Sequence, residues 1–193
     1  MKKDLSQRPS VAELEAELNR VQYQHKYQTV LKSTMYTLIT VAAVAVLVAT
    51  LWLPVLQIYG NSMTPTLQDG EIIFSVKTSN LERGDIVAFY YNNKILVKRV
   101  IATAGDWVDI AEDGTVFVNG DELPEPYLEE KSFGDADIEL PYQVPDGKIF
   151  VMGDHRATSV DSRHTAVGCV SPEQIVGKII FRIWPLDQVG GIE

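Results

Sequence analysis

The pattern of apolar and polar positions divides the chain into three regions. No charged residue lies between Lys32 and Asp69, and residues 36–56 within that stretch are almost wholly apolar. At about 1.5 Å per residue, a helix over these residues would be roughly 30 Å long, which matches the hydrocarbon thickness of a bilayer. Aromatic residues lie near both ends of the run, where they favour the membrane–water interface. The pattern therefore predicts a transmembrane helix over residues 34–56.

Two other interpretations of the apolar run fit the sequence less well. A domain of this size seldom encloses a core helix that is apolar on every side. A cleaved signal peptide would have a shorter leading segment and a shorter apolar run, and a small-residue cleavage motif of the Ala-x-Ala kind would follow it. We therefore expect an uncleaved membrane anchor.

The basic residues predict the orientation of this anchor. Arg20, Lys26 and Lys32 precede the span, and no Lys or Arg follows it until Lys77. Positive charge is retained on the cytoplasmic side of a membrane. The N-terminus should lie in the cytoplasm and residues 57–193 outside the cell membrane.

The segment that precedes the span, residues 1–33, should be a cytoplasmic helix. Ser10 and Glu13 have the spacing of a capping box, and Leu14, Leu18 and Val21 have helical spacing. This apolar series is too short for the heptads of a dimeric coiled coil. A solvated helix that continues into the span is expected.

In the remainder, residues 57–193, short β-rich segments alternate with turn signals, which predicts a β domain. The segments expected to be strands are rich in Val, Ile and aromatic residues: 71–77, 85–91, 95–103, 107–111, 115–119, 148–152 and 175–184. Asn92-Asn93 and Asp113-Gly114 predict hairpin turns. Residues 124–145 carry four prolines and many acids and should form an irregular surface excursion. The predicted fold is a mainly β, antiparallel domain on one N-terminal transmembrane helix.

Composition and charge exclude several classes of function. The net charge is −9, with six bases and four acids in residues 1–33 and 11 bases and 22 acids in the rest. An acidic outer domain argues against nucleic-acid binding.

The lone Cys169 allows no intramolecular disulfide, and its strand-like surroundings predict a small buried hydrophobe. The histidines are isolated, so no metal is expected, and there is no glycine-rich phosphate loop, so no cofactor is expected either.

Ser62 is the first candidate for chemistry. It lies in Gly60-Asn61-Ser62-Met63-Thr64-Pro65, a constrained turn that could present a backbone N–H beside the hydroxyl. Such turns are more often purely structural. Six extended residues span at most about 20 Å, so Ser62 must lie close to the membrane surface whatever its role.

A nucleophilic serine needs a base, and the sequence leaves two kinds open. His155 or His164 could form a triad with Asp154 or Asp161. Alternatively, Lys98 lies between aliphatic residues on one face of a predicted strand, where desolvation would lower its pKa toward that of a general base.

Four blocks of sequence, taken together, resemble the bacterial type I signal peptidases, which are serine–lysine proteases. The blocks occur in the family's order: Asn61 to Leu67, Arg83 to Val87, Val97 to Ile101 with Gly105-Asp106, and Gly153 to Arg163. The resemblance covers nearly all of the outer domain and the anchor. It implies a signal-peptidase/LexA-like β fold and the shorter, Gram-positive-type architecture. It also implies cleavage of signal peptides from exported preproteins at the surface of the lipid bilayer.

The resemblance also implies roles for individual residues. Ser62 corresponds to the nucleophile and Lys98 to the general base, and Met63 to an apolar neighbour of the serine on the substrate side. Ser159 corresponds to a hydroxyl that orients the lysine amine. Supporting roles are implied for three further residues, namely an Asp161–Arg163 ion pair and the structural acid Asp154.

The chain departs from the family pattern at a few positions. Gly60 replaces a serine that supplies an oxyanion donor in some members, and His155 occupies a position usually filled by Asn. A non-catalytic membrane-anchored homologue that assists pilus or surface-protein assembly is the alternative function, and it should lack the serine or the lysine. A self-cleaving repressor would need a DNA-binding region where this chain has its span.

Overall fold

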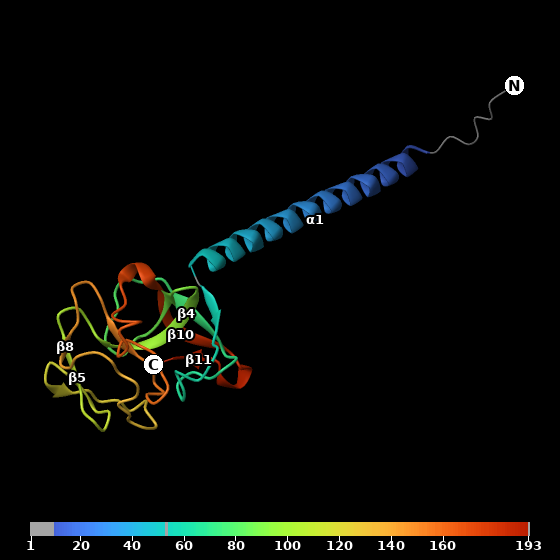
Figure 1. The fold of residues 1–193 in the computed structure, drawn as a ribbon. Helices are drawn as coiled ribbons and strands as arrows, with labels where there is room; N and C mark the ends of the chain where they lie inside the picture. The colour runs from blue at the N-terminus through green and yellow to red at the C-terminus, as the bar shows by residue number, and fades with distance from the viewer. Residues whose placement is uncertain (1–9, 53, 193) are drawn as a thin grey trace. The chain divides into compact units, whose positions relative to one another are not determined.

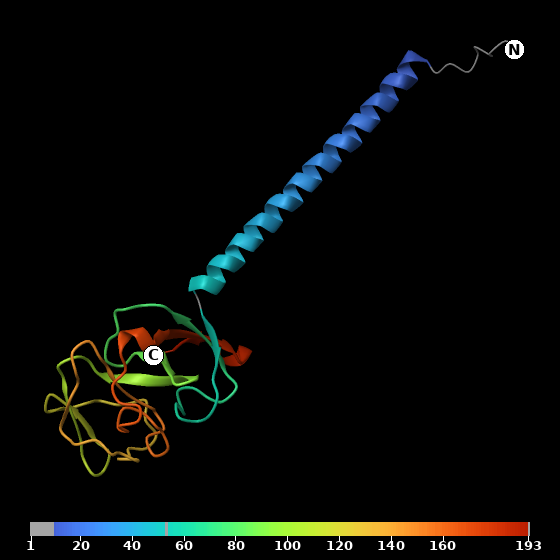
Figure 2. The same cartoon turned by 45° about the horizontal axis from the view of Figure 1, so that its top comes forward.

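The computed structural model describes residues 10–52 and 54–192. The chain divides into two compact units, Met1–Ala49 and Thr50–Glu193. The first contains most of a single helix and the second contains all of the strands. Figures 1 and 2 show the helix and the β domain from two directions.

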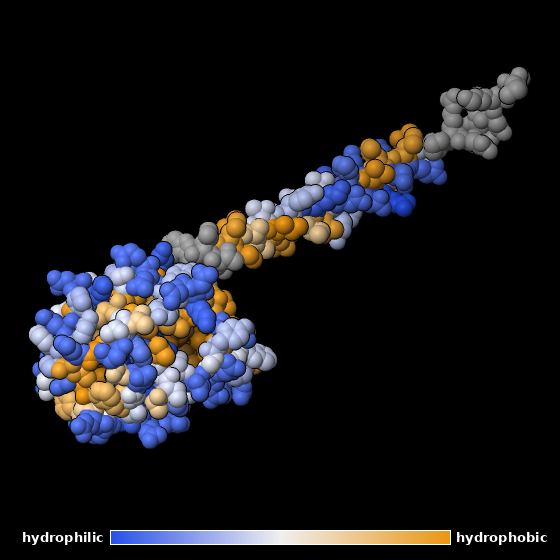
Figure 3. Space-filling model, viewed as in Figure 1, coloured by the Kyte–Doolittle hydropathy of each residue, from blue (hydrophilic) through white to orange (hydrophobic). Residues whose placement is uncertain are grey.

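Helix α1 (Val11–Trp52) begins at the predicted capping box. The Ser10 backbone N–H donates to the Glu13 carboxylate at 2.8 Å, and the Glu13 N–H donates to the Ser10 hydroxyl at 3.3 Å. Every side chain from residue 10 to residue 48 is exposed, and the C-terminal half of this range is predominantly apolar (Figure 3). Within the described residues, this is the one helix long and apolar enough to cross a membrane. Its full exposure removes the interpretation as a buried core helix.

The helix ends earlier than the sequence pattern predicts. The apolar run extends to residue 56, but α1 ends at Trp52, and β1 (Val55–Gln57) follows almost at once. Pro54 lacks the N–H that would continue the helical ladder, and it disfavours helical geometry in the residue before it. The helix therefore ends four residues before the predicted end of the span.

The β domain contains two antiparallel sheets. The larger has seven strands in the order β1-β2-β10-β3-β4-β9, with β11 paired to β10. Their bounds are β2 (Ile72–Val76), β3 (Ile86–Tyr91), β4 (Lys94–Ala102), β9 (Phe150–Met152), β10 (Ile175–Trp184) and β11 (Gly190–Gly191). The smaller has the order β7-β6-β5-β8, with β5 (Trp107–Ile110), β6 (Val116–Val118), β7 (Asp121–Glu122) and β8 (Tyr142–Gln143). Two short 3₁₀ helices flank β10, η2 (Pro172–Gln174) and η3 (Leu186–Gln188).

The antiparallel β prediction is confirmed, and all seven expected strands are present. Both hairpins are also found where predicted. Tyr91 pairs with Lys94 across a two-residue turn in which Asn92 has a φ of 51°, a conformation that asparagine tolerates well. The sequence pattern did not predict four short strands, β1, β7, β8 and β11, each of two or three residues.

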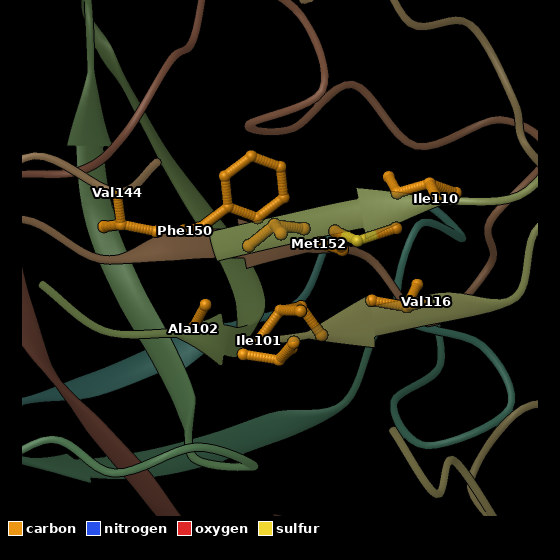
Figure 4. Close-up of a cluster of buried hydrophobic side chains, with 9 residues drawn as sticks. Ile101, Ala102, Ile110, Val116, Val144, Phe150 and Met152 are labelled. Carbon is orange, nitrogen blue, oxygen red and sulfur yellow. The ribbon is translucent and has the colours of Figure 1, made fainter. Parts of the chain in front are cut away.

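A hydrophobic core joins the two sheets (Figure 4). Ile101 and Ala102 from β4, and Phe150 and Met152 from β9, pack against side chains of β5 and β6. The predicted excursion 124–145 packs partly buried side chains against the same core, among them Phe133 and Leu140. Two further clusters pack against the larger sheet, and one of them contains Met63 and Leu67 from the turn that carries Ser62.

Candidate active site

Ser62 lies on a loop between β1 and β2 whose base is held closed. The Ile58 N–H donates to the Glu71 carbonyl at 2.8 Å, and the Gly70 N–H donates to the Ile58 carbonyl at 2.9 Å. Met63, next to Ser62, is 2% exposed and packs in the core below. Backbone bonds and a buried neighbour therefore fix the position of the serine, while Ser62 itself stays partly exposed.

Lys98 reaches Ser62 from strand β4. Its side chain is 2% exposed, and its Nζ donates a hydrogen bond to the Ser62 Oγ at 2.6 Å. Val87, its cross-strand partner on β3, is fully buried. Leu96 and Val100, two residues to either side, pack in the same apolar cluster as Val87. The apolar surroundings expected for this lysine are therefore present.

These surroundings change the acid–base behaviour of the amine. Burial lowers the pKa of Lys98 from its usual 10.5 to about 8, with Asp161 and Asp154 partly opposing the shift through their negative charge. A shift of this size raises the neutral fraction of the amine near pH 7 by about 300-fold. The Ser62 hydroxyl thus has a hydrogen-bonded partner that can accept its proton.

Asp154 holds the far end of the serine loop. Both of its carboxylate oxygens accept hydrogen bonds from Arg99, at 3.0 and 2.8 Å, and this pair is almost wholly buried. Thr66 donates its hydroxyl to Asp154 at 2.5 Å, and its carbonyl oxygen accepts from Arg182 at 2.5 Å. Two arginines and one carboxylate therefore fix the loop four residues after Ser62.

The segment from Gly153 to Arg163 closes over the opposite side of the serine. The His155 N–H donates to the Ser62 carbonyl at 3.1 Å. The Gly153 N–H donates to Asp161, whose carboxylate also accepts two hydrogen bonds from Arg163 at 2.9 Å each. Asp161 and Arg163 are fully buried, so the ion pair expected between them is present inside the domain.

Ser159 belongs to the same segment but makes a different contact from the one expected. The family resemblance predicts that it orients the Lys98 amine by a hydrogen bond. Its side chain is 4% exposed, and its hydroxyl has no hydrogen-bond partner among the described residues. It packs closely against Gly153, which leaves no room for a side chain at position 153. Ser159 thus lies near the site without the predicted bond.

Two residues of the excursion 124–145 support this site and were not predicted from the sequence. The Glu125 carboxylate pairs with both terminal nitrogens of Arg156, and the side chains are 1% and 0% exposed. Arg156 in turn donates from its Nε to the Gly153 carbonyl at 3.1 Å. The Tyr127 ring lies 3.9 Å from the Arg99 guanidinium. Glu125 and Tyr127 both lie in the excursion 124–145, where one acid among many carries no pattern that could identify it.

Neither histidine ring is the hydrogen-bond partner of the Ser62 hydroxyl, although the His155 backbone contacts the serine loop. The His155 ring contacts the Thr158 hydroxyl at 2.8 Å, and neither it nor His164 has a ring hydrogen bond to Ser62 in the described structure. His164 lies between Asp135 and Asp137, and the hydrogen bond to Asp135 raises its pKa. The geometry therefore favours Lys98 over either histidine as the partner of Ser62.

Among the described residues, neither a reactive thiol nor a metal-binding cluster is found. Cys169 is partly buried against the core between the sheets, and burial raises the pKa of its thiol, which disfavours a reactive thiolate. Among residues 10–52 and 54–192, no group of three His, Cys, Asp or Glu side chains is arranged to hold a metal ion.

A groove of about 690 Å³ leads to Ser62. Its walls are residues 56–60, in and after β1, and residues 93–98 at the start of β4, with Met63 beside the serine. Strand β1 is at an edge of the larger sheet, and the pairing of β4 with β9 begins only at Arg99. Both walls therefore offer backbone groups that are free to pair with an extended peptide.

Comparisons with known proteins identify the family of the chain. The family described as signal peptidase, peptidase S26, matches residues 31–184. The chain is 42% identical over 152 residues to signal peptidase IB of Staphylococcus aureus, covering 68% of this chain and 78% of that one. It is 38% identical over 143 residues to signal peptidase I of Bacillus licheniformis, covering 67% and 76%. A crystal structure of a signal peptidase I from Enterococcus faecalis V583 aligns with a TM-score of 0.44 at 30% identity, over 51% of this chain and 96% of that one.

Proposed function

The chain belongs to the signal peptidase family, peptidase S26, and we propose that Ser62 is its nucleophile and Lys98 its general base. It is a serine endopeptidase that cleaves signal peptides from preproteins. The observation that carries the assignment of the pair is the 2.6 Å hydrogen bond between a buried amine and an accessible hydroxyl. A non-catalytic homologue would have no reason to keep this pair in contact.

The proposed reaction has two stages. Neutral Lys98 accepts the Ser62 proton as the Ser62 Oγ attacks the scissile carbonyl, and the resulting ammonium donates that proton to the leaving amine. The released N-terminus belongs to the mature protein, and the signal peptide remains as an ester on Ser62. Lys98 then takes a proton from the water that attacks the ester carbonyl. The bond to the Ser62 Oγ breaks, Lys98 returns the proton to that oxygen, and the signal peptide leaves as a carboxylic acid with the neutral amine restored.

The other predicted site residues have supporting roles in this proposal. Asp161 with Arg163, and Asp154 with Arg99, fix the two segments that enclose Ser62. Gly60 has no hydroxyl to donate, so the backbone N–H of Ser62 is the proposed oxyanion donor. Ser159 is proposed to orient the Lys98 amine during the reaction, because its buried hydroxyl has no other partner among the described residues.

The substrate is proposed to bind in the groove as an extended strand between β1 and β4. Backbone hydrogen bonds to the two free edges would supply affinity, and the side chains next to the cut would point into the groove. Ile58 and Met63 form part of its buried lining, so small apolar side chains before the scissile bond are expected to fit best.

The proposed location follows from the apolar helix and the flanking charges. Signal peptidases are membrane-anchored, and this chain has one N-terminal apolar helix. We assign residues 1–33 to the cytoplasm, residues 34–52 to the span and the β domain to the outer face, because bases precede the span and are absent after it until Lys77. The lipid bilayer and exported preproteins are its partners, with no role for nucleic acid or metal.

Cleavage by single-residue variants tests the assignment. Full-length protein in detergent would be incubated with a preprotein, and the released mature N-terminus identified by mass spectrometry. Ser62→Ala and Lys98→Met should each abolish cleavage, while Lys131→Met, an exposed lysine outside the site, should cleave normally. Thermal melts would show that all three variants are folded. Full activity of folded Lys98→Met would refute the pair.

A further inference from the structure

The charged side chains of the β domain are largely paired. Eleven Lys and Arg residues follow position 50. Seven of them form ion pairs with carboxylates, and Lys98 contacts Ser62. Among the described residues, three lysines have no ion pair: Lys77, Lys94 and Lys148. The domain has twice as many acids as bases, so lysines without an ion pair are unexpected. The positions of these three lysines can therefore indicate where the domain binds an anion.

Two of these three lysines line one cavity. It has a volume of about 510 Å³ and lies between the segment that follows β2 and the segment that precedes β9. Its rim carries Lys77 and Lys148, which are exposed, and the half-buried Thr78 and Thr103, of which Thr103 donates its hydroxyl to Asp106. This cavity, the Lys77–Lys148 pocket, is separate from the Ser62 groove, with which it shares no lining residue.

The floor of the pocket is apolar. Ile149 and Val170 are buried members of one core cluster, and Leu81 and Ile175 pack against that cluster. Cationic and hydroxyl groups at the rim with aliphatic side chains below suit a molecule that has an anionic head and an apolar body. A free inorganic anion would use the rim alone and would leave the apolar floor in contact with water.

The pocket lies close to the point where the chain leaves the anchor. The Ser75 N–H donates to the Pro54 carbonyl at 3.0 Å, so β2 is hydrogen-bonded to the chain two residues after α1 ends. Lys77 is two residues beyond Ser75, which is about 7 Å of extended chain. Lys77 is therefore separated by only a short length of chain from residues that are hydrogen-bonded to the segment after the anchor.

We propose that the Lys77–Lys148 pocket binds an anionic phospholipid of the membrane in which the protein is anchored. The two ammonium groups contact the headgroup phosphate, and the glycerol and the start of one acyl chain cover the apolar floor. The net negative charge of the domain repels anionic lipid elsewhere, so binding at this pocket sets which face of the β domain meets the bilayer. The inference rests on the proposed membrane location and is independent of the roles of Ser62 and Lys98.

Native mass spectrometry of the full-length protein tests this inference. Protein in neutral detergent would be offered equal amounts of phosphatidylglycerol and phosphatidylcholine with identical acyl chains. Retention of phosphatidylglycerol over phosphatidylcholine by about tenfold or more is expected, because each lysine near a lipid surface contributes a favourable interaction with anionic headgroups. The double variant Lys77→Gln/Lys148→Gln should lose this preference, and the control variant Lys131→Gln, which also removes an exposed lysine, should keep it.

Two further measurements separate the possible results. Preprotein cleavage in neutral detergent should be unchanged in the double variant, so a failure of lipid binding would leave the catalytic proposal intact. Soluble glycerol phosphate at millimolar concentration should not displace the lipid, because it lacks the apolar part. Equal retention of the two lipids by the unaltered protein, an unchanged preference in the double variant, or displacement by glycerol phosphate would each overturn the inference.

Discussion

Replacement of Gly153 by alanine tests whether close packing between the segment from Gly153 to Arg163 and Ser62 is needed for catalysis. A Cβ at this position would lie 2.5 Å from the Ser62 carbonyl oxygen and closer still to the Ser159 Oγ. Neither separation is compatible with non-bonded contact. The Ser62 carbonyl is backbone, so it cannot rotate away as the end of a flexible side chain could. Either the loop that carries Ser62 or the segment that carries Gly153 must move, and both movements change the fit between them.

The size of the movement sets the expected effect on activity. Relief of the contact to Ser62 needs a displacement of about 0.7–0.9 Å, and misplacement of a reacting group by about 1 Å can reduce the rate 10²-fold. We therefore expect Gly153→Ala to lower kcat/KM by roughly two orders of magnitude. Overpacking of this kind costs about 1–3 kcal/mol of folding free energy, so Tm should fall by about 2–12 °C while the protein remains folded at assay temperature.

The assay compares Gly153→Ala with a glycine that has room for a methyl group. At Gly190 a Cβ would have no heavy atom within 4 Å, and the backbone has no positive φ, so Gly190→Ala should retain normal cleavage and normal Tm. Both variants would be assayed on one preprotein in detergent, with thermal melts beside the rates. If Gly153→Ala cleaves as fast as Gly190→Ala, the close fit between this segment and Ser62 is not needed for catalysis, and the reasoning is refuted.

Three further predictions follow from the same contacts. Since only the neutral amine can accept the serine proton, kcat/KM should rise with pH up to about 8, the pKa of Lys98, and then level off; a rate independent of pH between 6 and 9 would contradict this. Glu125→Gln should lower both Tm and kcat/KM, because it leaves the buried Arg156 without its counter-charge, which costs about 3–5 kcal/mol of folding free energy. The control Glu112→Gln, at an exposed position, should change neither. Arg182→Gln should reduce kcat with little change in KM, because Arg182 binds the Thr66 carbonyl in the serine loop but does not line the groove. An effect confined to KM would argue against a role of Arg182 in positioning Ser62.

The strands of the β domain could be predicted because each is a short run rich in Val, Ile and aromatic residues between turn signals. Burial alternates along β2, β5 and β6, whereas successive residues of β3 and β9 are buried. Lys98 illustrates how far such local reasoning extends, because its aliphatic neighbours alone indicate desolvation. The contact with Ser62, 36 residues earlier, could not follow from spacing. It depends on the loop before β2 and on strand β4, which are separate in the sequence and meet only in the folded sheet.

The remaining errors have local physical causes. The predicted span includes Val55 because hydropathy does not distinguish a helix from a strand that continues the same apolar run, and Pro54 is the one signal that separates them. Glu125 and Tyr127 fall in a predicted surface excursion because prolines and acids usually mark exposed loops. Their burial depends on Arg156 and Arg99, and no sequence period links an acid or a ring to an arginine some 30 residues away.

The central claim is that a neutral amine at position 98 activates Ser62, and chemical rescue tests it most directly. Lys98→Cys would be made in a Cys169→Ala background, so that the only thiol is at position 98. The full-length protein would be assayed on a preprotein before and after alkylation with 2-bromoethylamine, which rebuilds a lysine-like amine at that position. The account predicts no cleavage before alkylation and clear recovery after it, with the same cleavage site. Cleavage by the unmodified variant, or no recovery despite complete alkylation of folded protein, would contradict it.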